Sequence, residues 1–185
     1  MINVLGSSEP IRPLRDWLFD RGKVLKPKNL IKWNKLNFYF RAPLQILRKA
    51  RINGIESSLT RSIVKLINIE SNVIDIGANY GFLTLVCSKY VKNGGGKVYS
   101  FECNENCIKN LEFSIIENNL KNIELYNQLV GGENNNTTKT VDSLIYDHCK
   151  KIDLIKIDTD GTDLDCLKGC DKILEAFKPI IVIEI

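Results

Sequence analysis

The stretch Val73–Gly81 constrains the fold more than any other part of this chain of 185 residues. A short apolar run that contains Asp75 ends in a glycine loop and passes into an amphipathic stretch at 82–91. This order is typical of a strand, a tight loop and a helix whose N-terminus faces a ligand. Gly77 and Gly81 permit backbone conformations that a Cβ opposes, and they let a ligand lie directly on the main chain. We therefore predict a nucleoside-type ligand at this loop.

Apolar runs alternate with helical stretches through the rest of the chain. Near-continuous apolar strands separated by helices predict an α/β fold with a mostly parallel sheet and helices on both faces. Right-handed crossovers then bring the carboxyl ends of the strands to one edge, where ligands bind. The strands are expected at 73–76, 97–101, 123–126, 154–157 and 180–183, and the helices at 82–91, 107–120, 141–149 and 164–177.

Residues 1–56 are interpreted as a basic N-terminal extension, and residues 57–185 as the ligand-binding domain. Much of the excess positive charge in the net charge of +4 lies in the extension. We interpret it as a solvated face rather than a nucleic-acid-binding arm. Trp17 and Trp33 are expected to pack onto the domain. The extension should contain a helix at 11–19, a strand at 37–41 and a helix at 44–52. A helix capped by Ser57 or Ser58 should follow, with Leu59, Ile63, Leu66 and Ile67 on one side.

Several classes of protein are excluded or disfavoured by composition. No apolar run approaches the ~20 residues of a membrane span, and no signal peptide is visible, so we expect a cytoplasmic protein. The six cysteines form no CxxC pair and are expected to be reduced small hydrophobes, with no metal site. His148 is the only histidine, which excludes Ser-His-Asp and Cys-His schemes, and we expect it on the surface at a helix end.

Acidic residues end three of the expected strands. Asp75 ends the first, Glu102 ends the second, and Asp158 ends the fourth. Because these ends meet at one edge, we interpret the three carboxylates as parts of one site. Glu102, some twenty residues beyond the glycine loop, is placed to accept hydrogen bonds from both hydroxyls of a ribose.

The loop sequence differs from a dinucleotide fingerprint in a chemically informative way. A pyrophosphate needs free N–H groups and no adjacent negative charge, whereas this loop follows the carboxylate of Asp75. A carboxylate suits a ligand that carries an ammonium and a sulfonium. The sequence therefore favours S-adenosyl-L-methionine as the cofactor.

These residues, taken in order, resemble the FkbM family of S-adenosylmethionine-dependent methyltransferases over about residues 36–185. The resemblance implies a Rossmann-like class I methyltransferase sheet and methyl transfer to an oxygen of a small molecule, sugar or glycolipid. The string Lys156-Ile157-Asp158, followed after one residue by an acid and Gly161, is its sharpest marker. The matching segments are 73–84, 101–104, 118–122, 141–144, 153–161, 167–169 and 179–185.

The resemblance also implies roles for single residues. The loop would hold the methionine end of the cofactor through Asp75, Gly77, Ala78, Asn79 and Gly81. Glu102 would bind the ribose, with Cys103 and Asn104 beside the adenine. Asp158 would lie next to the methyl group and orient or deprotonate the acceptor hydroxyl, and Asp160 would stand beside it, where the family usually has a glutamate.

The sequence departs from the family in two further places. The segment between Val130 and Val141 is short, where relatives carry an extra strand pair, and the sequence stops at the expected fifth strand, so we expect a truncated sheet. These departures favour a second hypothesis, a non-catalytic binding module with the same fold. A third hypothesis is an RNA methyltransferase or RNA-binding protein, prompted by the basic extension. The sequence predicts neither the acceptor nor the oligomeric state.

Overall fold

A computed structural model describes residues 29–183, whose centre is a five-stranded sheet with the order β5-β4-β3-β8-β9. All neighbouring strands are parallel, and the order reverses at β3, which lies between β4 and β8. The α/β prediction is therefore confirmed. The helix expected at 11–19 and Trp17 lie outside the described residues. The strands are β3 (Val73–Ile76), β4 (Val98–Glu102), β5 (Ile123–Asn127), β8 (Leu154–Ile157) and β9 (Ile180–Ile183).

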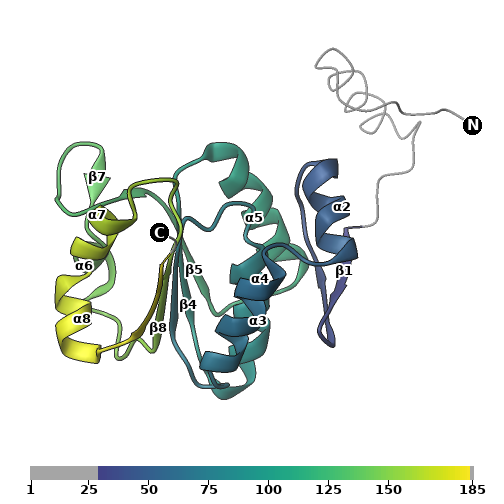
Figure 1. Ribbon diagram of the computed structural model, residues 1–185, viewed down its shortest axis with the longest axis horizontal. Helices are drawn as coiled ribbons and strands as arrows, with labels where there is room; N and C mark the ends of the chain where they lie inside the picture. The colour runs from purple at the N-terminus through teal and green to yellow at the C-terminus, as the bar shows by residue number, and fades with distance from the viewer. Residues whose placement is uncertain (1–28, 184–185) are drawn as a thin grey trace, which may run out of the picture.

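Helices cover both faces of the sheet, as Figure 1 shows. One face is covered by α3 (Ser57–Leu66), α4 (Phe82–Val91) and α5 (Glu105–Glu117). The other is covered by α6 (Val141–Ile145), α7 (Asp163–Lys168) and α8 (Asp171–Phe177). Within the described residues, no helix has the length and apolar character that crossing a bilayer requires.

An outer layer packs on α4 and α5, at the right of Figure 1. It consists of the antiparallel hairpin β1 (Leu30–Trp33) and β2 (Leu36–Tyr39), followed by α2 (Leu44–Ile52). The rings of Trp33, Phe38 and Phe40 surround that of Phe82, with centroid distances of 6.1, 5.5 and 5.6 Å. Such edge-on aromatic contacts are favourable beyond the area they bury. The predicted packing of Trp33 onto the domain is confirmed.

Short elements complete the connections. A 3-10 turn, η1 (Lys92–Gly94), joins α4 to β4. After β5, the strands β6 (Leu129–Val130) and β7 (Thr138–Lys139) form a two-residue parallel pair. The short segment between Val130 and Val141 thus contains one strand of this pair, β7.

Tertiary contacts changed several predicted helices. The helix expected at 164–177 is two helices, α7 and α8, which are separated by Gly169 and Cys170. Gly169 lies so close to Gly131 that an added Cβ would be 2.2 Å from the Gly131 carbonyl oxygen. α3 is preceded by Glu56 in a left-handed conformation, with no side-chain cap from Ser57 or Ser58. α5 begins two residues earlier than expected because the Asn104 side chain caps it. Leu66, which was expected to share one apolar side of α3 with Leu59, Ile63 and Ile67, is exposed.

Candidate functional site

A cleft of about 1220 Å³ opens at the carboxyl edge of the sheet. Its walls come from the segments that follow β3, β4 and β8, from β6, and from the connection between α2 and α3. The cleft lies where the strand order reverses, which is where α/β sheets bind ligands. The predicted residues that line it are Gly77, Ala78, Asn79, Gly81, Glu102, Cys103, Asn104, Asp158 and Asp160.

Every N–H group of the loop 77–81 already donates a hydrogen bond to another group of the protein. The N–H groups of Gly77 and Ala78 both donate to the carbonyl of Phe101, each at 3.0 Å. The N–H of Asn79 donates to Glu102, that of Tyr80 to the Asn79 side chain, and that of Gly81 to the Ala78 carbonyl. No N–H of this loop is left to bind a pyrophosphate, which would need several of them. The loop is instead a rigid surface against which an uncharged or cationic group can lie.

Left-handed backbone makes the loop possible. Gly77, Asn79 and Gly81 have φ values of +74°, +53° and +82°. Asparagine tolerates this region better than most residues, and glycine adopts it freely. At Gly77 a side chain is excluded for a second reason, because an added Cβ would lie 1.9 Å from the carbonyl oxygen of Asp158. The loop and the segment after β8 therefore touch directly.

Glu102 ties the second strand end to the loop. Its Oε2 accepts a hydrogen bond from the N–H of Asn79 at 2.7 Å. Its Oε1 accepts from the N–H groups of Cys103 and Asn104, at 2.9 and 2.8 Å. The carboxylate thus lines the cleft between the loop and the segment that leads into α5.

Asp75 lies behind the cleft, and it does not line it. Its side chain is fully buried, and Oδ2 accepts a hydrogen bond from the Thr84 hydroxyl at 2.5 Å. The other oxygen, Oδ1, has no hydrogen-bond donor but lies 3.4 Å from the ammonium of Lys156. Asp75 was predicted to contact the ligand directly. In the structure its side chain instead contacts Thr84 of α4 and Lys156 of β8.

Lys156 was named from the sequence only as part of a family marker, and its place in the site was not predicted. It is 3% exposed and stands beside Asp75 in the parallel register of β3 and β8. Its ammonium donates to the carbonyls of Ile76 and Gly77, at 3.3 and 2.9 Å, and lies 3.5 Å from Asp158. The signal available in the sequence was a lysine inside the otherwise apolar strand expected at 154–157.

The charges around Lys156 keep it protonated. Burial alone would lower its pKa, but the carboxylates of Asp75, Asp158 and Glu56 raise it above the ordinary value. A buried lysine with this many partners is a fixed cation. It joins the loop after β3 to the segment after β8.

The segment after β8 forms the wall opposite the loop. Asp158 is partly exposed in the cleft, whereas Asp160 is exposed and left-handed, with φ +52°. Asp163 fixes this turn, because its carboxylate accepts from the N–H groups of Thr159 and Gly161, at 2.8 and 3.2 Å. These bonds lower the pKa of Asp163 although burial opposes them.

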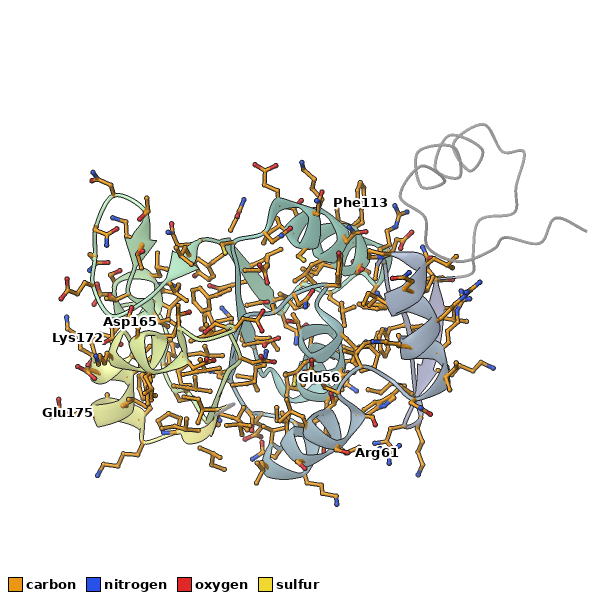
Figure 2. All side chains as sticks on the ribbon, turned by 45° about the horizontal axis from the view of Figure 1, so that its top comes forward. Glu56, Arg61, Phe113, Asp165, Lys172 and Glu175 are labelled. Atoms are coloured by element: carbon orange, nitrogen blue, oxygen red, sulfur yellow. The ribbon has the colours of Figure 1, made fainter. Side chains whose placement is uncertain are left out.

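Glu56 is a further cleft residue without a sequence signal. It lies in the connection between α2 and α3 and has φ +44°. Burial of its carboxyl raises its pKa, the charge of Lys156 lowers it, and the charges of Asp158 and Asp75 raise it. Figure 2 shows it at the beginning of α3, on the side of the sheet that carries α4.

Apolar and thiol groups line the end of the cleft near Glu102. Cys103 is exposed there, and Cys107 is buried with its Sγ 3.4 Å from Asn79 Oδ1. Burial and the charge of Glu102 raise the pKa of both thiols, so both are neutral at pH 7. Leu129, which the sequence reasoning also missed, exposes 44% of its surface in the cleft.

The other chemistry-bearing residues lie outside the cleft. His148 Nε2 lies 3.4 Å from Glu124 Oε2 and 3.3 Å from the Tyr126 hydroxyl. All six cysteines have free thiols, as expected. Among residues 29–183, no group of three or more His, Cys, Asp or Glu side chains could hold a metal ion.

The parallel sheet, its reversal at β3 and the cleft above that reversal define a Rossmann-like α/β fold. Residues 125–185 match the family model for the methyltransferase FkbM domain. The resemblance drawn from the sequence is therefore confirmed, with this match covering the C-terminal third of the chain. None of the curated proteins matches this chain.

Solved structures share the fold. A methyltransferase FkbM from Methylobacillus flagellatus KT is 20% identical, with a TM-score of 0.55 over 63% of this chain and 33% of its own. A precorrin-6y C5,15-methyltransferase from Geobacter metallireducens is 18% identical, with a TM-score of 0.55 over 78% of this chain and 66% of its own. A putative rRNA methylase from Clostridium thermocellum is 14% identical, with a TM-score of 0.53 over 68% and 65%. This chain thus spans one third of the first structure and about two thirds of the other two.

Proposed function

We propose that this protein is an S-adenosylmethionine-dependent methyltransferase that methylates a hydroxyl oxygen of a small molecule, sugar or glycolipid. The observation that carries the proposal is the combination of Glu102 with the loop 77–81. Glu102 offers a carboxylate for ribose hydroxyls, while the loop offers no N–H to a pyrophosphate. The fold of the neighbouring structures supports the same conclusion.

The donor side of the cleft would be built from two strand ends. Glu102 would exchange some of its backbone partners for the ribose hydroxyls, with neutral Cys103 and Leu129 beside the adenine. Ala78 and Asn79 would contact the methionine part. Asp75 would act through Lys156 and Thr84, because it holds both without reaching the cleft.

The acceptor side would be the segment after β8. The donor supplies an electrophilic methyl group when bound. Asp158 would hold the acceptor hydroxyl and accept its proton, since its side chain is partly exposed in the cleft and its backbone touches the loop at Gly77. Lys156, 3.5 Å away, would keep Asp158 in place. Holding the hydroxyl in line with the methyl group supplies much of the rate in such a displacement.

Calorimetry with S-adenosylmethionine tests the donor site. We expect the wild type to bind and Glu102→Gln to lose at least about tenfold in affinity, roughly 1.4 kcal/mol, because the amide cannot accept two hydroxyls as a carboxylate does. Glu175→Gln is the matched control, since Figure 2 shows Glu175 at the far end of the molecule on α8. Equal affinities for the two variants would contradict the site.

Transfer of a labelled methyl group to a panel of hydroxyl-bearing acceptors tests the activity. We expect Asp158→Asn to abolish transfer while it changes donor affinity by less than about threefold, because the residue serves the acceptor. Donor binding without transfer to any acceptor would instead favour the non-catalytic binding module.

An RNA acceptor is the second candidate, and one observation favours it. Lys49, from the basic helix α2, lines the cleft, and α2 also carries Arg48 and Arg51. A basic surface beside the cleft would bind phosphates in a salt-dependent way. RNA binding that is absent, or that does not weaken with salt, would dispose of this candidate.

A further inference from the structure

Glu56 is held in the cleft by the connection that carries it. The preceding Gly54 packs so closely against Trp33 that an added Cβ would lie 2.6 Å from the indole nitrogen. The Glu56 carbonyl accepts the N–H of Thr60 at 2.9 Å, which anchors the residue to the first turn of α3. Both attachments are to ordered, buried groups. The backbone that carries this cleft-lining residue is therefore held in place on both sides.

The carboxylates around Lys156 outnumber its single positive charge. Lys156 is the cation of the cluster, and Asp75, Asp158 and Glu56 all act on it. Asp75 is buried against Lys156 and neutralises it, since Asp75 Oδ1 has no other polar partner. The remaining carboxylates, Glu56 and Asp158, both face the cleft. Lys49 also lines the cleft, but the carboxylates of Glu56, Glu102, Asp158 and Asp160 outnumber it, so the lining carries a net negative charge.

We propose that Glu56 is a specificity residue through which the cleft distinguishes the positively charged methyl donor from its neutral thioether product. This inference rests on the proposed function. S-adenosylmethionine carries a sulfonium, and S-adenosylhomocysteine differs from it by one methyl group and that one charge. A carboxylate in the lining of the cleft would attract the sulfonium of the first and would gain nothing from the neutral sulfur of the second. Glu56 therefore favours binding of the donor and release of the product.

The test compares the two ligands by calorimetry. The quantity measured is the ratio of the dissociation constant for S-adenosylhomocysteine to that for S-adenosylmethionine. We expect Glu56→Gln to reduce this ratio roughly five- to tenfold, as expected for one partly solvated charge pair, with the affinity for S-adenosylhomocysteine changed less than about twofold. The matched control Glu175→Gln should leave the ratio unchanged.

A second variant separates charge from folding. Glu56→Asn also removes the charge, but asparagine suits the left-handed backbone, so the protein should be at least as stable as the wild type. Equal loss for both ligands, or an unchanged ratio, would overturn the inference while leaving the proposed function intact. If the wild type bound neither ligand, the proposed function would fail, and the inference with it.

Discussion

Gly77 is the residue at which two walls of the cleft touch. A side chain there would meet the carbonyl of Asp158 at 1.9 Å and would also need φ +74°. Gly95 has a similar φ of +85° with nothing within 4 Å of an added Cβ. The two glycines therefore separate the cost of the backbone conformation from the cost of the contact.

We expect Gly95→Ala to lower the free energy of unfolding by about 1 kcal/mol, the cost of left-handed backbone. Gly77→Ala should lower it by roughly 3 kcal/mol or more, because the segment after β8 must also move. Urea denaturation of both variants measures the difference. Equal losses would show that the close approach to Asp158 does not matter.

Lys156 is the second residue on which the site depends. Lys156→Met should lower the free energy of unfolding by about 3–5 kcal/mol, because it leaves the buried Asp75 and its neighbour Asp158 unpaired. The double variant Asp75→Asn, Lys156→Met should recover part of this loss. Lys65→Met, on the exposed side of α3, should change stability by less than about 0.5 kcal/mol. No recovery in the double variant would contradict the pairing of Asp75 with Lys156.

Among the elements, the turn after β8 depends on one carboxylate. The N–H donors of Thr159 and Gly161 lower the pKa of Asp163 despite the opposing effect of burial. An acid with a lowered folded-state pKa stabilises above its unfolded pKa, and this stabilisation is lost as the pH falls through the folded value. The turn should therefore be most stable at neutral pH.

Asp163→Asn should lower the free energy of unfolding by roughly 1 kcal/mol at pH 7, because one amide oxygen replaces a charged acceptor of two N–H groups. The difference from the wild type should shrink as the pH falls below about 4. Chemical denaturation at a series of pH values checks this, with the exposed Asp147→Asn as the control. A difference that is constant with pH would mean that the Asp163 charge is not what stabilises the turn.

Elements whose boundaries depend on local sequence were predicted well. The strands at 73–76, 154–157 and 180–183 have their predicted bounds, because each is an apolar run between polar or breaking residues. β1 was missed because its hairpin turn, Asn34-Lys35, has positive φ at both residues without a glycine to signal it. The break between α7 and α8 lies at Gly169, whose contact with Gly131, far away in the sequence, was not predicted.

The parts of the candidate site that depend on strand ends were predicted, and the parts that depend on contacts between distant segments were not. Glu102, Asp158 and the glycine loop could be placed because strand ends meet at one edge of a parallel sheet. Glu56 could not, because its place in the cleft depends on how the connection from α2 packs against Trp33. The burial of Asp75 could not be predicted either, since it requires knowing that Lys156 is its neighbour on β8.

At the scale of the whole molecule, the outer layer and the sheet share one hydrophobic core. Phe38 is 1% exposed and packs with Leu85 of α4 and Leu111 of α5. Phe38→Ala should lower the free energy of unfolding by about 3–5 kcal/mol. In a Trp17→Phe background, which leaves Trp33 as the fluorophore, unfolding should remain a single transition by both fluorescence and far-ultraviolet circular dichroism. Two separate transitions would mean that residues 29–56 form an independent unit.

The aromatic cluster of the outer layer ends on Phe82, the first residue of α4, which directly follows the loop 77–81. The outer layer therefore supports the start of α4, and with it the loop on which the ligand would rest. Opening of the hairpin and release of the ligand would then be thermodynamically linked, since each would destabilise the loop that the other depends on. A bound ligand would consequently slow hydrogen exchange of the amides of β1 and β2, on the far side of α4 from the sheet.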